Sequence, residues 1–281
     1  MYSLENALEM WDKAGKYGSP EERTARSKQW EPYYSYLAEC QTGEVYCPSE
    51  QAVGLVEFLI RENILRIGDC VLDIGAGMGS FALEFAKRCS KVSALDINNT
   101  CLKVLTERAE QLGLQNIRIV PEPWETYRAT GKFDITFSAM CPAICNKEEL
   151  LRLESMTRRT ACLYTVTRGS YEKHRMELMK LFPNRQPAGM VSEALHYYNV
   201  LYLMGRQPNI KTWSKYFEYK VAEIEYVKRY STYLQVFGIG DDESVPKLKD
   251  YFKHHSQDGA INETCQMNTA LIYWDVLGET K

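Results

Sequence analysis

The most informative segment of the sequence, residues 71–86, reads VLDIGAGMGSFALEFA. A short apolar strand carries a carboxylate, Asp73, close to its end. Gly75, Gly77 and Gly79 follow as a turn, and an apolar helical face comes next. Glycine lets the backbone turn sharply and approach a ligand closely, and the start of a helix presents unpaired N–H groups. The stretch therefore predicts a strand, a loop and a helix, with a ligand bound at the loop.

The spacing of the glycines favours a particular kind of ligand. The pattern is GxGxG and not the GxGxxG of dinucleotide-binding loops. Asp73, two residues before the first glycine, suits an ammonium group better than a pyrophosphate. Asp96 ends the next apolar strand, where an acid can accept hydrogen bonds from a ribose diol. The pattern favours an adenosine ligand with an amino group, and an NAD enzyme is the main alternative.

Apolar strands alternate with helical segments along most of the chain. This order predicts an α/β fold, a Rossmann-like and mostly parallel seven-stranded sheet flanked by helices. We expect an N-terminal helical cap over residues 1–66. A ligand-binding domain should span residues 67–281, with late helical insertions that include one around residues 185–210. The expected strands are residues 69–74, 91–95, 116–120, 133–138, 161–166, 211–221 and 269–276.

The motif formed by Asp73, the three glycines and Asp96 resembles the S-adenosylmethionine site of class I methyltransferases. The resemblance covers about residues 65–168 well and the rest of the chain in general layout. It implies a methyltransferase that binds S-adenosylmethionine and releases S-adenosylhomocysteine.

The resemblance also implies cofactor contacts from four segments. The glycine loop, which includes Ala76 and follows Asp73, would lie along the methionine part, and Asp96 would bind the ribose hydroxyls. The adenine would be flanked by Ile97, Pro123, Trp124 and Glu125. The sulfonium would lie beside Ser138, Ala139 and Met140.

Two departures from the family pattern bear on the reaction. Pro123-Trp124 stands where an Asp-Ala pair is common, so Glu125 is our candidate for the adenine amino group. No NPPY or DPPY motif, which would imply methylation of an amide or base amine, follows the fourth strand. Residues 141–145 read CPAIC in its place.

Candidates for acceptor binding come from three aromatic or thiol-bearing segments. They are Tyr33 and Tyr34 in an aromatic N-terminal run, Cys141 after the fourth strand, and Tyr197 and Tyr198 in a late helix. His196 is the candidate general base. Each has an alternative interpretation as a packing residue.

Composition and residue patterns argue against several classes of function. A net charge of −3 argues against a nucleic-acid substrate, although residues 23–28 form a local basic patch. The nine cysteines are scattered without metal-ligand spacing, which predicts no metal and a reduced, cytoplasmic protein. No apolar run reaches the ~20 residues of a membrane helix.

We expect a small-molecule methyltransferase. The alternatives are an RNA or protein methyltransferase and a non-catalytic S-adenosylmethionine-binding protein. The sequence carries no signal for an oligomeric state.

Overall fold

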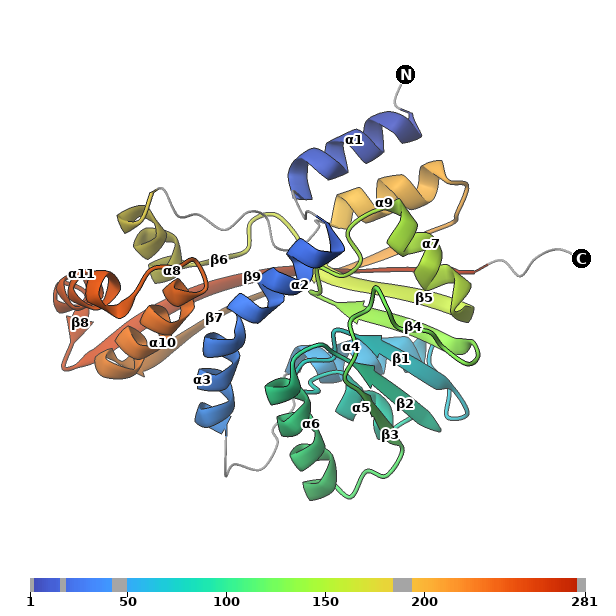
Figure 1. Cartoon of the computed structure of the whole chain (residues 1–281), viewed down its shortest axis with the longest axis horizontal. Coiled ribbons are helices and arrows are strands. Elements are labelled where there is room, and N and C mark those ends of the chain that lie inside the picture. The colour runs from blue at the N-terminus through green and yellow to red at the C-terminus, as the bar shows by residue number, and fades with distance from the viewer. Residues whose placement is uncertain (1–2, 16–18, 42–49, 184–193, 277–281) are drawn as a thin grey trace, which may run out of the picture.

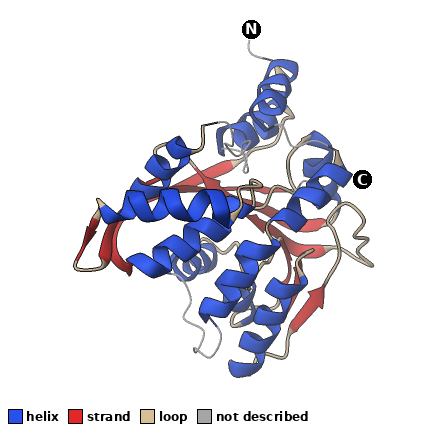
Figure 2. Ribbon diagram, turned by 60° about the vertical axis from the view of Figure 1, so that its left-hand side comes forward, coloured by secondary structure: helices blue, strands red, loops and turns tan. Residues whose placement is uncertain are grey.

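The computed structural model describes residues 3–15, 19–41, 50–183 and 194–276. Within them, nine strands form one sheet that is covered by helices (Figures 1 and 2). The strands are β1 (Cys70–Ile74), β2 (Lys91–Leu95), β3 (Ile117–Val120), β4 (Phe133–Ala139), β5 (Thr157–Val166), β6 (Tyr171–Glu172), β7 (Asn209–Ala222), β8 (Ser256–Gln257) and β9 (Ala260–Asp275).

The helices comprise a group before β1 and a group between or after the strands. Those before β1 are α1 (Leu4–Gly15), α2 (Pro20–Gln29), α3 (Glu31–Gln41) and α4 (Glu50–Arg61). The others are α5 (Ala82–Ala86), α6 (Asn99–Gln111), α7 (Lys147–Ser155), α8 (Lys173–Leu178), the 3₁₀ helix η1 (Met179–Leu181), α9 (Ala194–Leu203), α10 (Glu223–Gln235) and α11 (Asp241–Lys253).

The sheet has the order β3-β2-β1-β4-β5-β9, and its first five strands are parallel. β9 is antiparallel to β5, and β7 pairs with the other edge of β9. The predicted α/β class with a mostly parallel sheet is confirmed, but the described strands number nine and not seven. The two additional strands, β6 and β8, are two residues long and pair with the part of β9 that extends beyond β5.

Side-chain alternation along the strands builds one core on each face of the sheet. Val71 and Leu72 are neighbours in β1 but point into different cores. The Val71 core is covered by α4, α5 and α6, and the Leu72 core by α1, α7 and α9. Both faces are therefore closed to water, which is the usual condition of a parallel sheet.

A second lobe surrounds the far ends of β7 and β9 (Figure 1). α8, α10 and α11 pack there around a third core of buried side chains, among them Tyr226 and Phe252. The insertion expected around residues 185–210 is placed differently. Residues 185–193 lie outside the described residues, and α9 packs against the sheet in the Leu72 core. The extra helices come mainly from residues 223–253.

The four N-terminal helices have separate positions, although residues 1–66 were expected to form one cap. α1 packs on α9, where the rings of Trp11 and Tyr197 meet at 5.3 Å. α4 belongs to the core beneath β1. Only α2 and α3 lie across the carboxyl ends of the parallel strands (Figure 1). We refer to α2 and α3 as the cap helices.

The turn after β1 depends on Gly79. Its φ of +88° lies in the left-handed region, and a Cβ there would stand 2.7 Å from Leu105 Cγ. The helix after the turn, α5, begins at Ala82, after Phe81, without a side-chain cap. The absence of a side chain at Gly79 thus allows the turn to pack closely against α6.

Substituting Gly79 with alanine should lower the free energy of unfolding by about 1–3 kcal/mol, because the backbone is strained and Leu105 must move. Urea denaturation of the purified protein measures the change. Gly68→Ala is the control, since its Cβ would meet nothing within 4 Å and its φ is not positive. It should leave stability unchanged or raise it by up to about 1 kcal/mol. Equal stability of the two variants would contradict the role of Gly79.

Candidate active site

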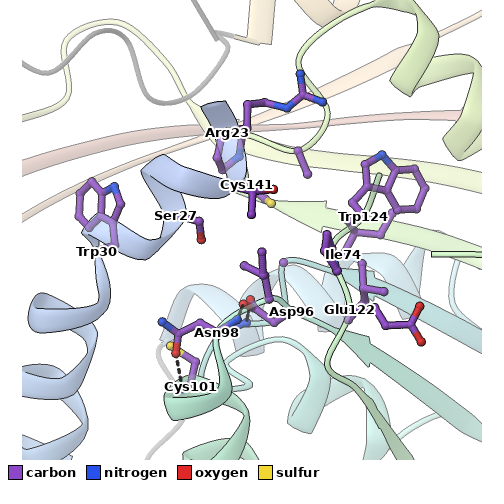
Figure 3. A pocket seen from close by; sticks show the side chains of 18 of the residues that line it. Arg23, Ser27, Trp30, Ile74, Asp96, Asn98, Cys101, Glu122, Trp124 and Cys141 are labelled. Carbon is purple, nitrogen blue, oxygen red and sulfur yellow. Dashed lines mark hydrogen bonds between the residues drawn. The ribbon is translucent and has the colours of Figure 1, made fainter. Parts of the chain in front are cut away.

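A cavity of about 340 Å³ opens at the carboxyl ends of β1, β2 and β4, beneath the cap helices (Figure 3). The strand ends and the loops after them contribute Ile74, Gly75, Gly77, Leu95, Asp96, Ile97, Asn98, Glu122, Pro123, Trp124, Glu125, Ala139, Met140, Cys141, Pro142 and Ala143. α6 contributes Cys101, and the cap helices contribute Arg23, Thr24, Arg26, Ser27, Trp30 and Tyr34. This edge of an open α/β sheet is where such folds bind ligands.

Asp96 connects the two segments that form the floor of the cavity. One carboxylate oxygen accepts a hydrogen bond from the Gly77 backbone N–H at 2.8 Å, and the other accepts one from Asn98 N–H at 2.8 Å. Burial raises the pKa of Asp96, while these backbone donors act in the opposite direction. A carboxylate oxygen can accept two hydrogen bonds. Asp96 therefore keeps the capacity to accept from a ligand.

Gly77 leaves open space on the cavity wall. Its φ is +52°, and a Cβ at this position would meet nothing within 4 Å. Gly75 is different, because a Cβ there would stand 2.5 Å from Cys141 Sγ. The loop after β4 thus packs directly on the glycine loop, and Met140 turns it with a φ of +48°. A ligand can approach the backbone at Gly77, where no side chain intervenes.

Four of the predicted cofactor residues lie behind the cavity wall. They are Asp73, Ala76, Gly79 and Ser138, none of which lines the cavity. Ser138 Oγ donates to the Ile74 carbonyl at 3.0 Å, which fastens β4 to β1. Both oxygens of Asp73 are buried without a hydrogen-bond partner among the described residues. Burial, together with the charge of Asp96, raises the pKa of Asp73 to about 8.

Trp124 contributes to the wall, but its ring is held by residues outside the cavity. The indole N–H donates to Glu149 at 2.5 Å, and the Arg152 guanidinium lies 4.3 Å from the ring centroid. Only 3% of the residue is exposed. Figure 3 shows Trp124 and Trp30 at opposite ends of the cavity. Trp124 therefore acts as a fixed part of the wall next to Glu125.

Arg23 ties the first cap helix to this same wall. Its guanidinium contacts Glu125 at 3.0 Å and Glu149 at 3.4 Å, and 8% of its side chain is exposed. At the next helix, Glu31 accepts hydrogen bonds from the side chains of Asn98 and Thr100. The cap is thus fastened on two sides of the cavity.

The predicted acceptor residues separate into two groups. Tyr34 and Cys141 line the cavity, and burial raises the pKa of both groups, that of Cys141 to about 12. Tyr33 packs on Tyr233 of the second lobe. The three α9 residues lie elsewhere. Tyr197 is buried and donates to the Ile144 carbonyl, Tyr198 stacks on Tyr202, and His196 is not among the lining residues.

The sequence pointed to Tyr34 on the cap side of the cavity but not to Arg23, Arg26 or Ser27. Arg23, Arg26, Ser27, Trp30 and Tyr34 recur at helical spacing and all face the cavity. That spacing was visible in the sequence. However, a face composed of arginine, serine and aromatic residues resembles a solvated helix and not a core-facing one.

Comparison with known proteins agrees with this geometry. Residues 71–161 match the family model described as a methyltransferase domain. This segment is a methyltransferase domain. It contains the glycine loop, Asp96 and the loops after β3 and β4. The parts outside it, which include both cap helices and the second lobe, are not covered by the model.

Individual relatives of the methyltransferase domain are distant. A Haemophilus influenzae protein of unassigned function is 24% identical over 115 residues, which are 40% of this chain and 43% of that protein. A Methanobrevibacter smithii protein assigned as cobalt-precorrin-6B C(15)-methyltransferase (decarboxylating) is 27% identical over 81 residues, 28% of this chain and 42% of that protein. The chain thus matches about two fifths of the length of these curated relatives.

A solved structure supports the fold over a wider region. A proposed methyltransferase from Bacillus halodurans C-125 superimposes with a TM-score of 0.51 and 15% identity, and the match covers 79% of this chain and 99% of that one. At this identity the likeness concerns the fold.

The described residues contain no cluster of three or more His, Cys, Asp or Glu side chains able to hold a metal ion. Among the helices that the structure describes, none has the length and apolar character needed to span a membrane.

Replacing Asp73 with asparagine should flatten the dependence of stability on pH. The unfolded chain loses this proton near pH 3.8, whereas the folded protein keeps it to about pH 8. Between these values the folded state binds more protons, so stability falls as pH rises. Urea denaturation from pH 5 to 8 should show a smaller decrease for Asp73→Asn than for the wild type. Asp250→Asn, on the exposed side of α11, should follow the wild type.

Replacing Arg23 with glutamine should loosen the first cap helix, because it removes the contacts of this helix with Glu125 and Glu149. Hydrogen exchange should become faster in residues 20–29 and stay unchanged in β1 and β4. Arg26→Gln is the matched control on the same helix, since Arg26 has no ion pair among the described residues. If both variants exchange equally, the Arg23 contacts do not hold the cap.

Proposed function

We propose that the protein is an S-adenosylmethionine-dependent methyltransferase that acts on a small-molecule acceptor. The observation that supports this most directly is the pairing of Asp96 with the open backbone at Gly77 on one cavity wall, within a methyltransferase domain. Asp96 would hold the ribose hydroxyls, and the backbone at Gly75 and Gly77 would hold the methionine part. Ile97, Pro123 and Glu125 would surround the adenine.

The residues present fit this cofactor. Ribose hydroxyls need acceptors, and the Asp96 oxygens each have capacity left after their backbone bonds. The amino group of the methionine part carries a positive charge, and Asp96 supplies a carboxylate beside the glycine loop. Asp73 does not reach the cavity, and burial keeps it protonated below about pH 8.

The cofactor supplies a methyl group on a sulfonium, which an acceptor lone pair can displace directly. The protein's residues contribute alignment and exclusion of water, which can replace several kcal/mol of the barrier. The cap helices cover the reacting centre, and Met140 with Ala139 would form the wall beside it.

No histidine lines the cavity among the described residues, and His196 lies on α9. Proton removal by His196 therefore has no geometric support. An acceptor with a free lone pair, such as an amine, a thiolate or a carboxylate, needs no general base.

The cap also bears on the alternative substrates. A polymer such as RNA needs an extended basic groove, whereas this cavity lies beneath two helices and the net charge is −3. These features favour a small acceptor over RNA or a protein. The scattered cysteines, which are free wherever the structure describes them, favour a reducing compartment such as the cytoplasm.

Calorimetric titration with S-adenosylmethionine and S-adenosylhomocysteine tests the proposal. We expect micromolar binding of both, no binding of NAD, and a loss of roughly 10- to 100-fold in affinity in Asp96→Ala, since hydrogen bonds to a charged acceptor disappear. Asp250→Ala is the matched control and should bind like the wild type. Binding of NAD, or adenosyl binding that Asp96→Ala leaves intact, would sink the proposal. Binding without turnover across acceptor pools would favour the non-catalytic alternative.

A further inference from the structure

The cap side of the cavity contains one cation without a counterion among the described residues. Two arginines line the cavity, Arg23 and Arg26. Arg23 is neutralised by Glu125 and Glu149. Arg26 is half-buried and forms no hydrogen bond or ion pair with another described residue. Partly buried charges are normally paired, because desolvation of an unpaired charge costs free energy.

Two aromatic side chains and a hydroxyl lie on the same wall as Arg26. Trp30 is fixed by rings of the second lobe, Tyr233 at 5.9 Å and Phe237 at 6.3 Å, and it packs on Tyr34 at 5.9 Å. Ser27 follows Arg26 and also lines the cavity. A flat apolar molecule can pack against such rings while an acidic group on it meets a guanidinium.

The charges on the opposite wall leave Arg26 available for a ligand. Glu125 is already paired with Arg23, and Asp96 accepts hydrogen bonds from the Gly77 and Asn98 N–H groups and none from Arg26. Glu122 lines the far side and is exposed to water. The guanidinium can bind an oxyanion through two parallel N–H bonds, which also fixes the orientation of the bound molecule.

We propose that Arg26 binds an acidic group of the methyl acceptor, and that the acceptor is a planar organic anion packed between Arg26, Trp30 and Tyr34. This inference rests on the proposed methyltransferase function, because it assigns the substrate class of the same cavity. The carboxylate of the cofactor's own methionine part is also an oxyanion that a guanidinium can bind. The experiment therefore distinguishes the acidic group of the acceptor from the carboxylate of the cofactor.

The first arm measures the cofactor alone. S-adenosylhomocysteine and 5′-methylthioadenosine, which lacks the amino-acid part, are titrated into the wild type and Arg26→Gln. We expect Arg26→Gln to bind both ligands within about twofold of the wild type. A selective loss of S-adenosylhomocysteine affinity of about tenfold or more would assign Arg26 to the cofactor carboxylate and overturn the acceptor assignment. If the wild type does not bind S-adenosylhomocysteine, the proposed function is refuted. This outcome differs from a loss of affinity that occurs only in Arg26→Gln.

The second arm uses benzoate and its neutral analogue benzamide as probes, with the protein saturated with S-adenosylhomocysteine. We expect benzoate to bind about tenfold more tightly than benzamide, because a charge-assisted bond forms only with the anion. The preference should disappear in Arg26→Gln, return in part in Arg26→Lys, and persist in Arg88→Gln, which removes an exposed arginine elsewhere. Equal affinity for the two probes, no binding of benzoate, or a preference that survives Arg26→Gln would overturn the proposal. Matching thermal unfolding of all variants confirms that each is folded.

Discussion

The backbone N–H of Gly77 donates a hydrogen bond to the Asp96 carboxylate, and this contact joins the two segments between which the cavity opens. It is one of several contacts between the β1 segment and the β2 segment. The two strands pair in parallel, with Ile74 opposite Leu95. The N–H groups of Gly75 and Ala76 then donate to the Leu95 carbonyl. The loop after β1 is therefore held against the end of β2 before any ligand arrives. A preformed loop binds a ligand without the entropy cost of ordering it.

The outer half of the cavity comes from parts of the chain that the methyltransferase domain does not include. Arg23 fastens α2 to Glu125 and Glu149, and Glu31 fastens α3 to the start of α6. Trp30 is packed against α10 of the second lobe. The family domain thus contains the residues proposed to bind the cofactor, and this chain's own cap and second lobe supply the side on which the acceptor is proposed to bind. The fold alone therefore does not determine the acceptor, because function depends on the site built on the fold.

The sequence predicted the parts that local patterns determine. The sequence predicted the apolar runs of the parallel strands, the glycine loop and Asp96, because each follows a local rule of periodicity or turn chemistry. β5 begins earlier than expected, since Arg158 and Arg159 make its first residues look like a loop, although they pair with Asp134 and Asp69. β9 also begins earlier than expected, at Ala260. Its first half is polar and therefore looks like a loop in the sequence, but it is stabilised by pairing with β7. On the cap side of the cavity the sequence indicated Tyr34 but not the arginines of α2, because their positions depend on contacts between residues more than 100 positions apart, as in the bond from Arg23 to Glu125.

A crystal structure of the protein with S-adenosylhomocysteine bound is the sharpest test of the proposed cofactor site. We expect the adenosyl group to lie beneath α2 and α3, with both ribose hydroxyls within hydrogen-bond distance of Asp96 and the homocysteine part over Gly77. We also expect an open volume between the sulfur, Arg26 and Trp30. An adenosyl group bound at any other place, or a ribose that does not meet Asp96, would show that the proposed site is wrong.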